Sequence, residues 1–81
     1  MLEAKTFTAV TTPTLLSLPN AALIRNNGTD TVYFGGPNVT ADTTATGGFQ
    51  LASGEKLQVN DAEDVYFVIA SGKSATITVL S

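Results

Sequence analysis

The residue types that most often carry chemistry are scarce in this chain of 81 residues. It contains neither histidine nor cysteine, which removes the usual general base, the thiol nucleophile and the best ligands for zinc, copper and haem. The one cluster of ionisable side chains consists of Asp61, Glu63 and Asp64. Paired carboxylates can act as general acid and base, and they can bind calcium when further oxygen ligands follow at regular spacing.

Three interpretations of this acidic cluster stay open: a solvated turn between two strands, a calcium site and a catalytic pair. A calcium loop would need more oxygen ligands than this segment supplies. A glycosidase-like pair would need a cleft, for which a domain of this size has little room. We expect the solvated turn, and we therefore predict no enzyme activity, no metal and no cofactor.

Two glycine-containing segments superficially suggest phosphate binding, but neither has the spacing that such a site requires. Ser71–Ser74 (SGKS) lacks the first glycine of a phosphate-binding loop, and no helix is predicted after it. Gly35-Gly36 is too short for a dinucleotide fingerprint. We interpret both segments as turns.

The charge pattern disfavours nucleic acids and membranes as partners. The net charge is −3, and the four basic residues (Lys5, Arg25, Lys56 and Lys73) are scattered along the chain. Binding to phosphate groups or to an anionic lipid surface needs a basic patch. No apolar stretch approaches the length of a membrane span, and the first residues do not resemble a signal peptide.

The composition points to protein surfaces as partners. Charged residues make up 14% of the chain, against roughly 25% in typical soluble domains. Threonine, serine, asparagine and glycine must therefore cover much of the surface, and such a surface is easily buried against another protein. The threonine content can equally reflect β-strands, which favour β-branched residues. A domain this small, without disulfides or a metal, is commonly stabilised by association with other subunits.

The hydrophobic pattern predicts an all-β fold. Apolar residues alternate or form short blocks, and glycine, proline or asparagine interrupts them about every ten residues. This spacing is typical of a small antiparallel β-sandwich or barrel of about seven to eight short strands. The expected strands cover residues 5–11, 14–18, 20–26, 31–35, 49–51, 56–60, 65–70 and 75–80. The expected core comprises Phe7, Leu23, Ile24, Val32, Phe34, Phe49, Leu51, Leu57, Val59, Val65, Phe67, Ile69, Ile77 and Val79.

Turn residues suggest how these strands connect. Asn27-Gly28 predicts a β-hairpin in which 31–35 pairs with 20–26, because both residues tolerate positive φ. Ser71–Ser74 predicts a second hairpin turn. Residues 38–48 are the most polar and least patterned part of the chain, and we expect a surface loop there.

The chain is predicted to form one domain, with a β-sandwich over residues 21–81. Residues 1–20 are either an N-terminal arm or the first strands of the same sandwich. Contacts with partners are expected where the core pattern is weakest, and at two tyrosines that either face out from adjacent strands or sit half-covered at strand edges. The candidate contact residues are Thr6, Thr8, Thr12, Leu15, Leu16, Tyr33, Asn38, Thr40, Thr43, Thr44 and Tyr66.

Three stretches show a similarity to a known group of proteins. They are ALIRNNGTDTVYFGGPNVT over residues 22–40, GFQLASGEKL over 48–57 and DVYFVIASGKSATITVL over 64–80. Together they resemble short β-sandwich modules of tailed-bacteriophage structural proteins, which include head-decoration, head-fibre and tail-associated proteins. The shared features are turn signatures and strand spacings, so the resemblance implies a fold more than a task, and it supplies no catalytic residue.

The resemblance implies a virion protein present in many copies, often as a trimer. A free-standing chain of this size is most similar to the head-decoration group. We therefore expect a capsid decoration protein, made in the bacterial cytoplasm, that binds the major capsid protein or other virion subunits on the phage head. The alternatives are a tail, neck or head-fibre subunit and a module that binds host glycans.

Overall fold

The fold consists of short β-strands. The computed structural model describes residues 3–18, 20–42 and 47–81, and within these ranges it contains strands and no helix. The prediction of an all-β protein is confirmed. The strands are β1 (Ala4–Thr8), β2 (Thr14–Leu18), β3 (Ala22–Asn26), β4 (Val32–Gly35), β5 (Phe49–Leu51), β6 (Lys56–Val59), β7 (Glu63–Val68) and β8 (Thr76–Leu80).

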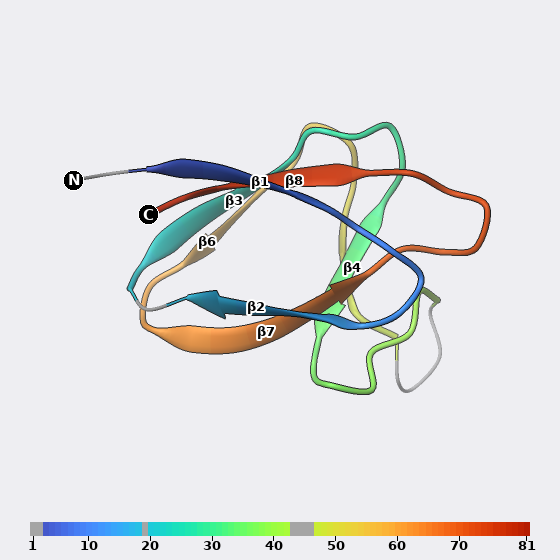
Figure 1. The fold of residues 1–81 in the computed structure, drawn as a ribbon, viewed down its shortest axis with the longest axis horizontal. Coiled ribbons are helices and arrows are strands. Elements are labelled where there is room, and N and C mark those ends of the chain that lie inside the picture. The colour runs from blue at the N-terminus through green and yellow to red at the C-terminus, as the bar shows by residue number, and fades with distance from the viewer. Residues whose placement is uncertain (1–2, 19, 43–46) are drawn as a thin grey trace.

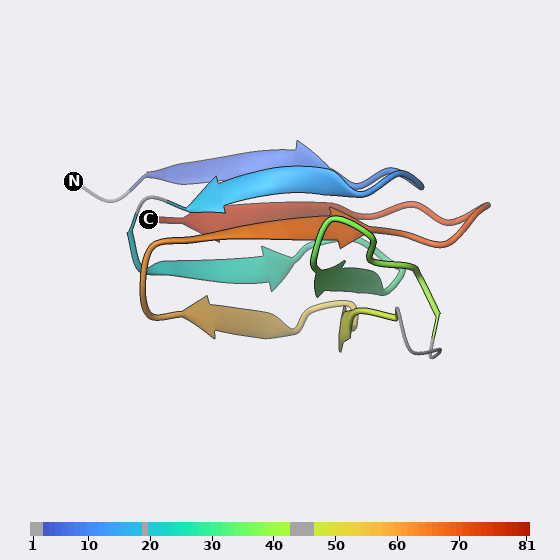
Figure 2. The ribbon, with the colours of Figure 1, turned by 90° about the horizontal axis from the view of Figure 1, so that it is seen from below.

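The strands form two antiparallel sheets that pack face to face (Figures 1 and 2). Sheet A has the order β1-β8-β3-β6, and sheet B has the order β2-β7-β4-β5. The pairs β1·β8, β2·β7, β3·β6 and β4·β5 show that the chain is a long two-stranded ribbon, folded so that successive pairs alternate between the sheets. This is the arrangement of an eight-stranded jelly roll. Strands β1 and β2, which lie within residues 1–20, thereby each form an edge strand of one sheet.

The ribbon stays hydrogen-bonded where it crosses from one sheet to the other. Between β1·β8 and β2·β7, the Ala9 amide donates to the Ala75 carbonyl at 3.0 Å, and the Ile69 amide donates to the Val10 carbonyl at 3.0 Å. At the crossing from β3 to β4, the Asn26 amide donates to the Glu55 carbonyl at 3.0 Å. The crossings therefore satisfy backbone groups that a simple loop would leave to water.

Both hairpins predicted from turn residues are wrong, because the strands they join belong to different sheets. β3 pairs with β6 and β8, whereas β4 pairs with β5 and β7. Neither Asn27 nor Gly28 has a positive φ. The Ser71–Ser74 turn likewise leads from β7 in sheet B to β8 in sheet A, with Gly72 at φ +79°. The glycine at position 28 serves a different purpose, since a Cβ there would lie 2.5 Å from Cα of Ala75.

The core lies between the two sheets. Phe34 of β4 and Phe67 of β7 are cross-strand partners, and their ring centroids lie 6.2 Å apart. Much of the predicted core is buried, and Phe7, Leu57, Val59 and Val65 pack against it. Two predicted core residues are not in it: Leu23 is half-buried on the outer face of sheet A, and Phe49 is exposed. The buried residues that the pattern missed are Ala9, Leu16, Leu18, Ala22, Asn26, Val39, Val68 and Ala75.

Candidate protein-binding surfaces

The outer face of sheet B brings together three of the predicted contact residues. Leu15 is the cross-strand partner of Tyr66, and Tyr33 lies on the neighbouring strand opposite Val68. Because side chains alternate along a strand, Leu15, Tyr33 and Tyr66 all point away from the core. Leu15 is 50% exposed, and both tyrosines are half-buried. We call this surface the tyrosine face; its outward residues are Leu15, Ser17, Tyr33, Gln50, Asp64 and Tyr66.

The segment after β4 is anchored beside the tyrosine face. Val39 is buried, and a Cβ on Gly48 would lie 2.6 Å from its Cγ2. The Val39 amide donates to the Gly36 carbonyl at 3.0 Å, and the Gly48 amide donates to the Thr40 carbonyl at 3.2 Å. Val39, Thr40 and Gly48 of the predicted surface loop are therefore fixed by packing and hydrogen bonds. The predicted contact residues Asn38 and Thr40 line a hollow that also includes Pro13 and Val68.

The remaining predicted contact residues do not join this surface. Thr6 and Thr8 pair with Thr78 and Thr76, on the outer face of sheet A. Thr12 is exposed in the crossing between β1 and β2. Thr43 and Thr44 lie outside the described residues.

Leu16 was wrongly predicted as a contact residue. It is 4% exposed and faces the core opposite Val65. Its neighbour Leu15 points outward, because consecutive strand residues face opposite sides of a sheet. The leucine pair in β2 thus divides into one surface residue and one core residue.

The outer face of sheet A has a different character from the tyrosine face. Leu80, which is 37% exposed, lies in register with Ala4 and Leu23. Arg25 and Lys56 are cross-strand partners on the same face. Two of the four basic residues therefore sit beside a small apolar group, and this face carries local positive charge.

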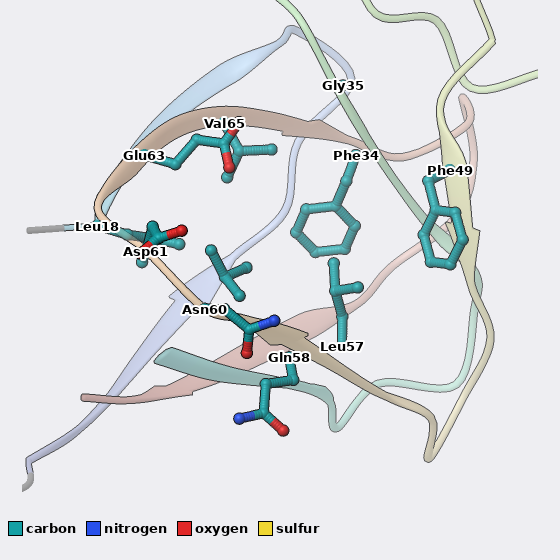
Figure 3. A pocket seen from close by; sticks show the side chains of 11 residues that line it. Leu18, Phe34, Gly35, Phe49, Leu57, Gln58, Asn60, Asp61, Glu63 and Val65 are labelled. Carbon is teal, nitrogen blue, oxygen red and sulfur yellow. The ribbon is translucent and has the colours of Figure 1, made fainter. Parts of the chain in front are cut away.

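A pocket opens between β5 and β6, where the edge of the sandwich is not closed (Figure 3). Its volume is about 400 Å³, and Phe34, Phe49 and Leu57 form one end of it. Phe49 pairs with Phe34 and so lies on the inner side of sheet B, yet it is 61% exposed. The cause is that β5 has only three residues, and Phe49 is the first of them. The full lining is Leu18, Phe34, Gly35, Phe49, Leu57, Gln58, Val59, Asn60, Asp61, Glu63 and Val65.

The acidic cluster is divided by the start of β7. The sequence had suggested a turn for all three residues of the cluster. Glu63 and Asp64 instead belong to this strand. Glu63 lines the pocket, while Asp64 points to the tyrosine face opposite Ser17. All three carboxylates are exposed. Within the described ranges, no group of three or more acidic residues is arranged to hold a metal ion.

Comparison with known proteins identified no relative of this chain. No protein-family model, curated protein or solved structure matches the chain. In residues 3–18, 20–42 and 47–81, no helix is long and apolar enough to cross a membrane. The tyrosine face and the pocket at Phe49 are the two surface features that suggest binding of a partner.

The exposure of Phe49 leads to a testable expectation about stability. Phe49→Ser should lower the free energy of unfolding by less than about 1 kcal/mol, because the ring already contacts water. It should also reduce fluorescence of a bound uncharged apolar dye such as Nile red, because an apolar wall of the pocket is lost. Gln50→Ser, on the opposite face of β5, is the matched control and should change neither value. A loss of more than about 2 kcal/mol in Phe49→Ser would show that Phe49 is a core residue.

Proposed function

We propose that this chain is a non-enzymatic virion structural protein that decorates a phage head and binds the major capsid protein through its tyrosine face. The observation that carries the proposal is the convergence of Leu15, Tyr33 and Tyr66 on one outer sheet surface. Tyrosine is enriched, and charged residues are depleted, in the buried centres of protein interfaces. The strands on this face offer one carboxylate, Asp64, and no basic side chain.

The fold supports the same proposal by analogy. Eight-stranded jelly rolls are a common architecture of viral capsid proteins, and also of lectins. Since one fold serves many functions, the residues on the tyrosine face indicate the function more specifically than the topology does. The resemblance of residues 22–80 to tailed-phage structural modules favours the virion role.

The mechanism that we propose is stabilisation by binding. A protein that binds the assembled shell, but not its dissociated subunits, shifts the equilibrium towards the shell. A sheet face whose strands carry a single carboxylate among apolar and neutral polar residues loses little solvation energy when it docks. We propose a trimer as the bound form, because closed rotational symmetry allows three copies to sit around a threefold position of a capsid lattice.

Two matched leucine variants test which face binds. Leu15→Glu places a charge on the tyrosine face, and Leu80→Glu places one on the outer face of sheet A. We expect Leu15→Glu to weaken co-sedimentation with capsid shells assembled without this chain by at least about tenfold, since a charge in an interface core is costly. Leu80→Glu should bind like the parent chain, and circular dichroism should show that both variants are folded.

The outcome also distinguishes the rival roles. A parent chain that neither sediments with the shells nor raises their melting temperature would contradict the decoration role. Binding to tails, necks or head fibres in place of shells would support a structural role elsewhere on the particle. Light scattering at several concentrations measures the subunit number independently.

A glycan-binding role is the second candidate. It is favoured by the position of Tyr33 and Tyr66, which lie diagonally on adjacent strands of the same outer face. Aromatic rings on a shared face can stack against sugars. Saturable binding on a glycan array that is lost in Tyr66→Ala, together with no shell binding, would favour this role over decoration.

A further inference from the structure

The pocket at Phe49 coincides with an incomplete part of sheet B. On one side of β7, strand β2 pairs with every residue from Glu63 to Phe67. On the other side, the pairing with β4 ends where Gly35 meets Tyr66. Among the residues that the structure describes, the first three residues of β7, Glu63–Val65, therefore have a neighbouring strand on one side only. An unpaired strand edge is a template for another strand.

The chain itself turns away from this gap. After Gly35, the segment Gly36–Val39 forms a turn closed by the hydrogen bond from the Val39 amide to the Gly36 carbonyl. Val39 then packs close to Gly35, whose added Cβ would lie 2.9 Å from Cγ2 of Val39. Pro37 has no amide hydrogen to donate to a sheet. β4 is thus prevented from extending along β7, and the gap is a consequence of how the chain folds.

The gap offers three kinds of recognition at once. The free edge of Glu63–Val65 offers backbone groups, and Phe34, Phe49 and Leu57 form an apolar hollow at one end of the pocket (Figure 3). Asp61 and Glu63 lie at the other end, and the described lining contains no basic residue. A small apolar ligand would use only the hollow. An extended peptide would use the edge, the hollow and the carboxylates together.

We propose that an extended segment of a protein partner completes sheet B in this gap. The segment pairs with the free edge of Glu63–Val65 and inserts one apolar side chain among Phe34, Phe49 and Leu57. A lysine or arginine two positions away along the segment faces Asp61 and Glu63, because residues two apart share one face of a strand. The acidic rim and the apolar hollow thus specify a segment with an apolar anchor and a basic neighbour.

This site is separate from the tyrosine face, so each proposal can fail alone. The tyrosine face lies on the outer side of sheet B, whereas the pocket opens between the sheets. Leu15→Glu is expected to leave peptide binding at the pocket unchanged. Phe49→Ser is expected to leave shell binding through the tyrosine face unchanged.

The test uses a short peptide set and the full chain. The probes are acetyl-Thr-Lys-Thr-X-Thr-Lys-Thr-amide, where X is valine, leucine, isoleucine or phenylalanine, so that a lysine lies two positions from the anchor in either direction. We expect at least one probe to bind saturably, with amide shifts in nuclear magnetic resonance spectra at residues 34, 49, 57 and 63–65. The same peptide with glutamate in place of both lysines should bind at least about tenfold more weakly.

Variants of the chain separate the three kinds of recognition. Phe49→Ser should weaken the best probe about tenfold through loss of the hollow. Glu63→Gln combined with Asp61→Asn should weaken the lysine probe several-fold and strengthen the glutamate peptide, because the like-charge repulsion is removed. Glu3→Gln removes the same kind of charge at an exposed position outside the pocket, and it should bind like the parent chain.

Several results would overturn the proposal. One is the absence of saturable binding by all four probes at about 2 mM, a concentration that detects even millimolar affinity. A second is undiminished binding by a probe whose amides beside X are N-methylated, which would indicate a site for apolar ligands without strand pairing. A third is self-association of the chain alone that is lost in Phe49→Ser, which would show that a second copy fills the pocket.

Discussion

Replacing Gly28 with alanine should lower the free energy of unfolding by about 3 kcal/mol or more. A Cβ at this position would lie 2.5 Å from Cα of Ala75, 2.8 Å from its Cβ and 2.8 Å from the amide nitrogen of Thr76. Two of these three atoms belong to the backbone where the chain enters β8, so no side-chain rotation relieves the clash. The two crossing segments would have to separate, which would disturb the hydrogen bond from the Asn27 amide to the Thr76 carbonyl.

Gly36→Ala is the matched control for this prediction. A Cβ on Gly36 meets nothing within 4 Å, and Gly36 does not have a positive φ. The free energy of unfolding of Gly36→Ala should stay within about 0.5 kcal/mol of that of the parent chain, or rise slightly because alanine restricts the unfolded chain. Urea unfolding of both variants measures the difference. Equal stability of Gly28→Ala and Gly36→Ala would mean that the crossing at Ala75 is looser than the structure shows.

The position of Gly28 illustrates which part of the fold could be predicted from the sequence. Alternation with period two is a local property, and it located the strands because each strand buries one face. The partner of a strand depends on residues far away in the chain. Asn27-Gly28 has the composition of a hairpin turn, but its glycine is required by contact with Ala75, which is distant in sequence. No local pattern contains that information.

The candidate surfaces show the same division. The sequence left open whether Tyr33 and Tyr66 face out from adjacent strands or sit half-covered at strand edges. The register of β4 and β7 places both on the outer face of sheet B, where each is half-buried. In β2, Leu15 and Leu16 are adjacent and of the same type, so the sequence alone does not indicate which of them faces the core. Phe49 was expected in the core because of its residue type. Its exposure follows from its place as the first residue of the three-residue edge strand β5, which depends on how the whole sandwich is assembled.

Asn26 gives the other large expected effect on stability, because its side chain joins two crossing segments inside the protein. It is completely buried. Its Nδ2 donates to the Asp30 carbonyl at 2.9 Å and to the Leu51 carbonyl at 2.8 Å, and its Oδ1 accepts from the Gly28 amide at 2.8 Å. Both amide hydrogens and the oxygen therefore have partners, which is the condition under which a buried polar side chain stabilises a fold.

Asn26→Ala should lower the free energy of unfolding by about 3 kcal/mol, because three backbone groups lose their partner and the Leu51 carbonyl is left in a buried position. For a domain of this size, that corresponds to a fall of about 15 °C in melting temperature. Asn27→Ala is the neighbouring control. The Asn27 side chain is exposed and donates to the Thr78 hydroxyl, so its removal should cost only about 0.5 kcal/mol.

Hydrogen exchange tests the mechanism as well as the magnitude. If Asn26 acts by holding the crossing together, the Gly28 amide should exchange faster in Asn26→Ala, even under conditions where the protein remains folded. The β1·β8 ladder, at the far side of sheet A from β6, should stay protected under the same conditions. A loss of stability below about 1 kcal/mol, with unchanged exchange at Gly28, would show that water replaces the side chain at these carbonyls. The stability of the crossing would then come from its other hydrogen bonds, among them the backbone bonds between Asn26, Gly54 and Glu55.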